Sequence, residues 1–447
     1  MYDELKFGNC NHSRDPIVGC ALEGVASVVA GINDVSIIIH SPQGCAATVA
    51  AAFDSHEVDF TKRKVGCTRL FETDIILGAS EKLKNLIMEA DNTFNTKVMF
   101  VVGTCAADII GEDIIGICNS LQDKIKAKLI PVVAGGFRGN TYDGIDIGLS
   151  ELLHFIEKND DKVANTVNII APQGSINPTW WADLKWLKDT LDFLGIRVQT
   201  VIPYNTSLEE LKEASKASAN ILLSQDVGYK FCNKMEELHD VPLILKDIPL
   251  PIGLDNTARW LRELGKYFKV EKRVEMLIKQ GEELVVNILR KRALMIIPRY
   301  RNCKIAISAD ATMGTGLIRM LFNELEMIPE VILIRSNNNE SIKILERELD
   351  ELGIKPKVAF GIDGYQIKEA LKTSNIDSVI GSSWEKYMAE EIGIKLAFDS
   401  FSPTNRDVYV DRAYMGYDGM LNILEVIGND WERAYRSKEI DWEESFK

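Results

Sequence analysis

Short β-branched apolar runs alternate with longer segments of helical period, and this alternation constrains the fold more than any other feature of the sequence. The runs fall into three groups along the chain. The first group comprises Ser36–His40, Val98–Val102 and Leu129–Val133. The second comprises Val167–Ala171, Val198–Ile202, Ile221–Leu223 and Pro242–Leu245. The third comprises Lys304–Ser308, Val331–Arg335, Lys357–Phe360, Ser378–Ile380 and Lys395–Phe398. Strand-like runs that alternate with helices are typical of parallel α/β units.

The three groups predict more than one domain, because 447 residues are many for a single core. We predict an α/β protein with three Rossmann-like parallel-sheet domains around a central cleft, over residues 1–160, 161–300 and 301–447. The charged stretch Glu157–Lys162 separates the first two domains. The segment Glu271–Ile297, rich in Glu, Lys and Leu, is predicted to form one long helix that leads into the third.

The composition narrows the class of protein. No apolar run reaches the roughly 18–20 residues of a membrane span, and Met1–Lys6 lacks the basic-then-apolar layout of a signal peptide. We therefore expect a cytoplasmic protein without a membrane partner. The formal net charge of −14 disfavours nucleic acid as a partner. Eight cysteines in such a protein are expected to be free thiols.

Three of these cysteines lie where chemistry could use them. Cys45 follows the strand-like run that ends at His40, and Cys105 follows Val98–Val102 within Gly103-Thr104-Cys105. Cys20 sits in a Gly19-Cys20 turn ahead of the small-residue helix Ala21–Ala30. Open parallel sheets bind ligands outside the carboxyl ends of their strands. Free backbone N–H groups at such places stabilise thiolates, which are the usual ligands of iron–sulfur clusters.

The spacing of these cysteines does not decide their role. A single cysteine after a strand is more often structural, and the three do not form a compact CxxC set. From the residues alone, a structural role and a cluster-ligand role both stay open.

Three segments resemble the cluster-ligand segments of nitrogenase component 1 proteins: Gly19-Cys20, His40-Ser41-Pro42-Gln43-Gly44-Cys45 and Thr104–Ile114. The separations, 25 residues from Cys20 to Cys45 and 60 from Cys45 to Cys105, also fit that family. The resemblance extends over nearly the whole chain through further segments: Thr73–Leu83, Gly136-Phe137-Arg138-Gly139, Pro249–Thr257, Lys304–Leu317, Phe401-Ser402-Pro403 and Gly416–Met420.

The resemblance implies that Cys20, Cys45 and Cys105 bind an iron–sulfur cluster shared with a partner subunit. In the family this is an eight-iron P-type cluster or a [4Fe-4S] cluster. The implied partner is a homologous component 1 subunit, in a heterotetramer or a homodimer. The loop that would supply a fourth ligand contains Gly136, Asn140 and Asp143 but no Ser.

The resemblance also implies a separate iron–sulfur ATPase as the electron donor. Gly314-Thr315-Gly316 follows a strand-like run but lacks the Lys-Ser/Thr of a P-loop, so nucleotide hydrolysis is expected in another protein.

The chain departs from catalytic α-type subunits at two positions. These subunits hold a large iron cofactor with one Cys and one His. Ser224 or a neighbour stands where the Cys would fall, and Met415 stands where the His would fall. A thioether replaces imidazole poorly. We therefore expect a β-type partner or a member with different chemistry, while an additional iron-rich cofactor elsewhere in the complex stays open.

The function implied by the resemblance is a reductase subunit that relays low-potential electrons from an ATP-dependent iron–sulfur reductase, through the interfacial cluster, to a substrate or a second metallocluster. Two alternatives stay open. One is a scaffold on which a metallocluster is assembled, and the other is a subunit of a tetrapyrrole or organosulfur reductase.

Further residues could line the site or the cleft. His40, Gly44 and Gly103 flank the proposed ligands. Cys67 is interpreted as a packed thiol, with a ligand or redox role as the alternative. Arg138 could pair with an anionic substrate group or with Glu112 or Asp113. The remaining cysteines divide into two groups. Cys10, with His12, could approach a metal, whereas Cys118, Cys232 and Cys303 are expected to be structural.

Overall fold

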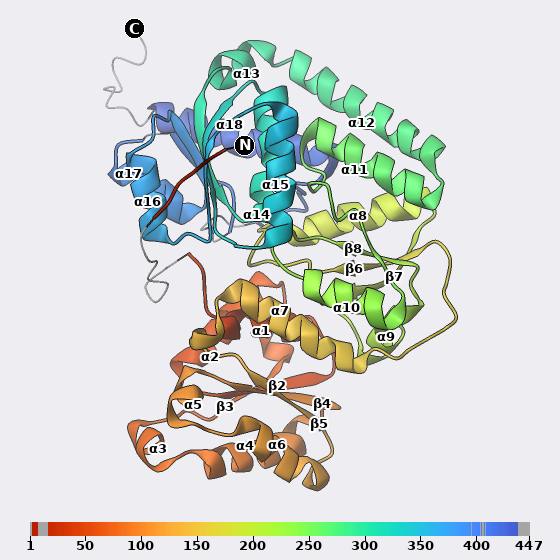
Figure 1. The fold of residues 1–447 in the computed structure, drawn as a ribbon, viewed down its shortest axis with the longest axis vertical. Helices are drawn as coiled ribbons and strands as arrows, with labels where there is room; N and C mark the ends of the chain where they lie inside the picture. The colour runs from red at the N-terminus through yellow and green to blue at the C-terminus, as the bar shows by residue number, and fades with distance from the viewer. Residues whose placement is uncertain are drawn as a thin grey trace.

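The computed structural model describes residues 2–7, 17–394, 396–402, 404, 406 and 408–436. Cys10 and His12 lie outside the described residues. Within them, the chain folds into three parallel β-sheets covered by helices (Figure 1), which confirms the predicted fold class. The domain limits at residues 160 and 300 stay a prediction. In the described part of the chain, no helix combines the length and the apolar character needed to cross a bilayer.

The first sheet has the strand order β3-β2-β4-β5, and all its strands are parallel. Its strands are β2 (Val35–His40), β3 (Lys64–Cys67), β4 (Val98–Gly103) and β5 (Lys128–Val133). Its helices are α1 (Ala21–Ala30), α2 (Gly44–Ser55), α3 (Glu72–Leu77), α4 (Ser80–Phe94), α5 (Cys105–Ile110), α6 (Ile114–Leu121) and α7 (Thr141–Leu152), with a short 3-10 turn η4 (Gly136–Arg138).

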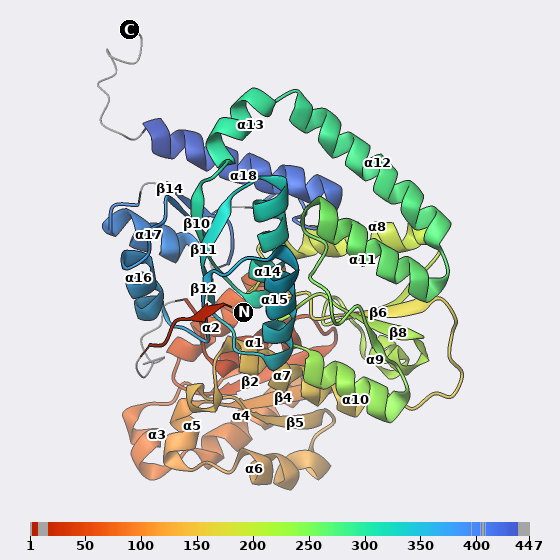
Figure 2. The same cartoon turned by 45° about the horizontal axis from the view of Figure 1, so that its top comes forward.

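Both faces of this sheet are buried, as the apolar strands require. Ile38, Met99 and Val101 pack against α4 and α6 on one face. On the other face Ile37, Ile39 and their neighbours pack under α1, α2 and α7. Figure 2 shows α1 and α7 side by side between the first sheet and the rest of the chain.

Glycines allow the close approach of α1 and α7. A methyl carbon placed on Gly144 would lie 2.0 Å from the carbonyl oxygen of Ala21, and one on Gly24 would lie 2.2 Å from the carbonyl oxygen of Thr141. No larger residue fits at either position without moving a backbone. The two helices therefore hold residues 20 and 140, at their amino ends, close together.

The second sheet has the order β7-β6-β8-β9. Its strands are β6 (Thr166–Ile170), β7 (Arg197–Ile202), β8 (Ala219–Leu222) and β9 (Leu243–Ile244). The helices that follow are α8 (Trp180–Leu194), α9 (Leu208–Lys212), α10 (Tyr229–His239), α11 (Gly253–Phe268), α12 (Glu271–Arg290) and α13 (Ala293–Tyr300).

The prediction of one helix over Glu271–Ile297 is wrong, because the chain turns at residues 291–292 between α12 and α13. The turn directs Tyr300 into the core, where it is 3% exposed and its ring lies 5.5 Å from that of Trp431. The packing of Tyr300 against Trp431 thus outweighs the continuous helical pattern of the sequence before it.

The third sheet has the order β1-β12-β11-β10-β13-β14. Its strands are β10 (Lys304–Ala309), β11 (Ile328–Ile334), β12 (Lys357–Phe360), β13 (Ser378–Gly381), β14 (Leu396–Asp399) and the two-residue β1 (Asp3–Glu4). Its helices are α14 (Ala311–Arg319), α15 (Asn339–Leu352), α16 (Gly364–Lys372), α17 (Ser383–Glu391) and α18 (Gly416–Arg436). The start of the chain therefore adds a strand to the last sheet.

A buried carboxylate joins the second and third sheets. Asp226, in the loop after β8, is 4% exposed and accepts hydrogen bonds from the backbone N–H groups of Ala311 and Thr312, each at 2.8 Å. It also accepts from the hydroxyls of Thr312 and Ser336. Residues 311 and 312 begin α14, so the carboxylate satisfies orphan donors at a helix amino terminus.

Replacing this carboxylate by an amide is expected to destabilise the protein. In Asp226→Asn, an NH2 group would face a backbone N–H that has no other acceptor, at a cost of about 1–3 kcal/mol. The measurement is the thermal unfolding midpoint, with the exposed Asp161→Asn as the matched control. Equal midpoints for the two variants would show that Asp226 does not join the sheets.

Candidate functional site

Thiols gather at the carboxyl edge of the first sheet. Cys67 is the last residue of β3, Cys45 lies in the first turn of α2 directly after β2, and Cys105 begins α5 directly after β4. Because β3, β2 and β4 are adjacent and parallel, the three cysteines lie at the same edge. This is the edge at which open parallel sheets bind ligands.

Cys20 reaches the same edge from the amino terminus of α1. It pairs with Asn140 in an isolated antiparallel bridge. Gly136, which follows β5, lies between Cys20 and Cys105. Its N–H donates to Sγ of Cys105 at 2.9 Å. A methyl carbon on Gly136 would lie 3.3 Å from Sγ of Cys105 and 3.6 Å from Cβ of Cys20.

The four thiols form one electrostatic group. Burial raises the pKa of Cys45, a hydrogen bond with Ser41 lowers it, and the thiols of Cys20, Cys105 and Cys67 raise it further. All four side chains are half-buried, so they are open to a neighbouring molecule. By contrast, the other cysteines of the described chain are buried, as expected for packed thiols: Cys118, Cys232 and Cys303.

The side chains of this edge offer thiol sulfur, the usual donor to iron–sulfur clusters. No three His, Cys, Asp or Glu side chains of the described residues converge as the ligands of one ion do. A cluster takes its thiolates on different irons, so its ligands need not converge on one point. The backbone N–H of Gly136 donates a hydrogen bond to the sulfur of Cys105.

His40 lies directly under this edge and is fully buried. Its Nε2 is 3.9 Å from Oε2 of Glu112, and neither ring nitrogen has a hydrogen-bond partner in the described structure. Burial lowers the pKa of His40, although the Glu112 carboxylate opposes this shift, so the imidazole is neutral at pH 7. The charged side chains that act on this ring are Glu112, Asp74 and Lys82.

The two glycines predicted to flank the site differ in their surroundings. Gly44 is exposed, and a Cβ there would meet no atom within 4 Å. Gly103 is buried, and a Cβ there would lie 3.0 Å from Ile114. Open space beside Cys45 therefore lies on the Gly44 side.

The sequence suggested that Arg138 could pair with Glu112 or Asp113, but the structure shows neither ion pair. Its Nη2 lies 3.4 Å from Oδ1 of Asp108, and its side chain is 56% exposed. Glu112 instead accepts hydrogen bonds from Ala79 and Ser80, and Asp113 accepts one from the backbone of Gly116. Glu112 and Asp113 therefore accept hydrogen bonds from the amino termini of α4 and α6 instead of pairing with Arg138.

Large apolar side chains are exposed around the cysteines. Ile109, in the same helix as Cys105, is 68% exposed, and Phe137, next to Gly136, is 72% exposed. Helix α3, which packs against α5, exposes Ile76 and Leu77 at 79% and 84%. Clustered exposure of this kind is typical of a protein–protein interface.

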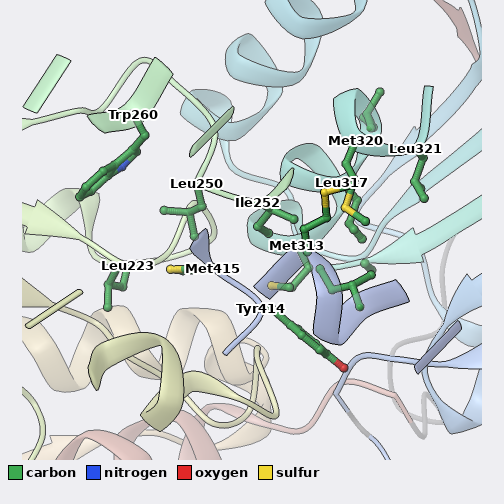
Figure 3. Packing of buried hydrophobic residues seen from close by; sticks show 14 of the residues in the cluster. Leu223, Leu250, Ile252, Trp260, Met313, Leu317, Met320, Leu321, Tyr414 and Met415 are labelled. Atoms are coloured by element: carbon green, nitrogen blue, oxygen red, sulfur yellow. The ribbon is translucent and has the colours of Figure 1, made fainter. Parts of the chain in front are cut away.

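Ser224 and Met415 lie in a closed core and do not face an open site. Each is 2% exposed. Figure 3 shows Met415 among Leu223 and Leu250. The cavity that Met415 and Leu223 line, together with Trp180 and Asp183, has a volume of about 10 Å³, room for about one water molecule. The cavity beside Met415 is therefore too small for a large iron cofactor.

A larger cavity of about 700 Å³ opens where the three sheets meet. Residues from all three parts of the chain line it, including Gly19, Tyr142, Ser175, Asp310 and Arg406. It lies directly behind the cysteines, because Gly19 and Thr141 face it while their neighbours Cys20 and Asn140 form the bridge at the thiol edge. None of the described lining residues is Cys or His, so its donors are oxygen atoms and guanidinium groups.

Asp310 is a buried acid that lines this cavity. It is 2% exposed, its Oδ1 accepts a hydrogen bond from the Tyr142 hydroxyl, and its Oδ2 has no partner in the described structure. Burial raises the pKa of Asp310 to about 7, although the nearby Arg335 opposes the shift. Near neutral pH it can therefore both give and take a proton.

Sequence reasoning missed Asp310 and Tyr142 as site residues. Asp310 directly follows β10, so the rule that made the cysteines candidates applied to it as well. No local signal marks Tyr142, which reaches Asp310 across 168 residues of sequence.

A family model described as Nitrogenase component 1 type Oxidoreductase matches residues 20–432. The Nitrogenase molybdenum-iron protein beta chain of Methanococcus maripaludis is 25% identical over 96% of each chain. The Nitrogenase iron-molybdenum cofactor biosynthesis protein NifE of the same organism is 25% identical over 91% of this chain and 82% of its own length.

A solved structure, "Nitrogenase Cp1 at pH 6.5", superposes with a TM-score of 0.79 at 18% identity, over 99% of this chain and 97% of that one. At this identity the likeness concerns the fold.

The titration of Asp310 is expected to lower stability as the pH rises. Its pKa of about 7 in the folded state exceeds the roughly 3.9 of an unfolded chain. The folded protein thus binds more protons, and stability falls between about pH 4 and pH 7. Asp310→Asn lacks this pH-dependent contribution to stability. The unfolding midpoint of the variant, relative to that of the wild type, should therefore rise between about pH 4 and pH 7. Parallel midpoint curves would contradict the assignment.

Placing Cys at position 224 and His at position 415, where catalytic α-type subunits would have them, is expected not to create a cofactor site. The double variant Ser224→Cys, Met415→His should keep the iron content of the wild type, because the surrounding core leaves only about 10 Å³. Iron analysis after anaerobic purification measures this. A gain of several irons per chain would show that the core opens.

Proposed function

Because the chain belongs to the nitrogenase component 1 type oxidoreductases, we propose that it is one subunit of a reductase complex and holds one side of a shared iron–sulfur cluster through Cys20, Cys45 and Cys105. The observation that carries this proposal is the grouping of half-buried thiols at one sheet edge. The exposed apolar side chains around that edge support it.

The partner in this proposal is a homologous component 1 subunit that covers the apolar surface of Ile76, Leu77, Ile109 and Phe137. Such a subunit would bring the remaining cluster ligands to the same place. A heterotetramer is the favoured assembly, with a homodimer as the alternative. Covering this surface would also exclude water from the thiols.

The electron source in this proposal is a separate ATP-dependent iron–sulfur reductase. Gly314, Thr315 and Gly316 are buried inside α14, so they form no exposed phosphate-binding loop. Nucleotide hydrolysis is therefore assigned to the partner reductase.

The cluster is either an eight-iron P-type cluster or a [4Fe-4S] cluster. When bound, it supplies reversible one-electron transfer at low potential. The chain's own residues bind it through thiolate sulfur, and the N–H of Gly136 stabilises the negative charge on Cys105. Thiol protons must leave on binding, so the affinity for iron rises with pH.

The cavity of about 700 Å³ behind Cys20 is the proposed substrate site. Iron–sulfur cofactors require thiolate or imidazole ligands, which the described lining residues do not provide. The oxygen donors there suit an organic substrate. Asp310, hydrogen-bonded to Tyr142, can hold a proton at Oδ2 and donate it to such a substrate.

Cys45→Ala tests the proposed cluster. We expect the anaerobically purified complex of this variant to lose the interfacial cluster, because the substitution removes one of its proposed thiolate ligands. Iron and acid-labile sulfide analysis with EPR measures the loss.

Cys118→Ala is the matched control, since Cys118 is a buried thiol on the opposite face of the same sheet. It should retain the full iron content. Full iron content in Cys45→Ala, together with an unchanged EPR spectrum, would overturn the proposed function.

A metallocluster-assembly scaffold is the second candidate function. The similarity to a cofactor biosynthesis protein favours it. A scaffold releases its cluster to an acceptor protein, whereas a reductase keeps it through turnover. Iron-55 labelling of the complex, followed by incubation with an apo-acceptor, distinguishes the two.

A further inference from the structure

Cys67 occupies the strand position next to Cys45. The strand order β3-β2-β4-β5 delivers Cys67, Cys45, Cys105 and Gly136 to the edge in spatial order. Neighbouring strands lie about 4.8 Å apart. Cys67 is thus the thiol on the β3 side of Cys45, as Cys105 is on the β4 side.

The side chain of Cys67 projects to the same face of the sheet as α2. Cys67 is in register with Ile39, and parallel neighbours in register point to the same face. Ile39 packs with Val49 and Phe53 of α2, and Cys45 packs against the same cluster. Cys67 and Cys45 are therefore on one side of the sheet.

The loops that carry these two cysteines are tied together. The N–H of Leu70 donates to the carbonyl oxygen of Ser41 at 3.0 Å, and the N–H of Ser41 donates to Oγ1 of Thr68 at 3.0 Å. Sγ of Cys67 lies 3.6 Å from Oγ of Ser41. Fixed loops hold a ligand geometry before the metal arrives, which lowers the cost of binding.

Cys67 differs from the packed thiols of this chain. It is half-buried, whereas Cys118, Cys232 and Cys303 are at most 8% exposed. Its sulfur has only long contacts, at 3.6 Å to the carbonyl oxygen of Ser41 and at 3.9 Å to that of Pro42. Each half-buried cysteine of the described chain lies at this edge, and no strong hydrogen bond holds this sulfur in a structural role.

The residue at the thiol edge after β5 is Gly136, which has no side chain that could bind a metal. Gly136 offers only its N–H, which Cys105 accepts. We propose that Cys67 is a fourth thiolate ligand of the cluster assigned to Cys20, Cys45 and Cys105. This inference rests on the proposed function. On binding, an iron–sulfur bond replaces the S–H bond of Cys67, and the proton passes to solvent.

Cys67→Ala and Cys67→Ser test the inference in the complex purified anaerobically with its partner subunit. The readouts are iron and sulfide content, the EPR spectrum, and iron release to the chelator bathophenanthroline. Losing even an outer partner of a metal ligand costs roughly 10–100-fold in affinity, so we expect Cys67→Ala to release iron at least that much faster. Cys67→Ser should keep the iron but alter the EPR signal. Cys118→Ala is the control for loss of a thiol.

Wild-type release and wild-type spectra in both Cys67 variants would overturn the inference, and the unfolding midpoint of each variant shows that it is folded. The two proposals fail differently. An unaffected Cys67→Ala beside a cluster-free Cys45→Ala removes only Cys67 from the ligand set. An unaffected Cys45→Ala removes the cluster assignment itself.

Discussion

The parallel register of the first sheet is the constraint on which the candidate site depends. Four neighbouring strands point the same way, so the residues at or just after the ends of β3, β2, β4 and β5 lie at one edge although they are spread over residues 45–136 of the sequence. The close packing of α1 on α7 then brings Cys20 to the same edge. Sheet geometry therefore assembles a group of thiols that no local motif contains.

A second constraint is the buried charge that joins the sheets. Asp226 caps α14 across the boundary between the second and third sheets, and Arg335 pairs with Glu385 at 2.9 Å close to Asp310. Buried charges are tolerated when they are paired and hydrogen-bonded. Asp310 departs from this rule, because one of its buried carboxylate oxygens has no partner in the described structure. A buried acid of this kind beside a cavity is the observation behind its proposed role toward a substrate.

Much of the fold follows from sequence pattern, because buried parallel strands are continuous apolar runs. The strands that were missed lack this signal. β3 contains Lys64 and Gly66, and β1 is the polar pair Asp3–Glu4, which is a strand only because β12 lies beside it. The cysteine positions could be predicted from the rule for strand ends. The partner of Arg138, the closed core around Met415 and the contact of Tyr142 with Asp310 depend on long-range packing, which propensities do not encode.

The central claim is that iron is held at the thiol edge of the first sheet, against a second subunit. An anomalous difference map at the iron absorption edge, from crystals of the complex grown without oxygen, tests it most directly. The account predicts iron density within bonding distance of the sulfurs of Cys20, Cys45 and Cys105, at the boundary between two chains. Density that is absent there, or enclosed wholly within one chain away from these sulfurs, would contradict it.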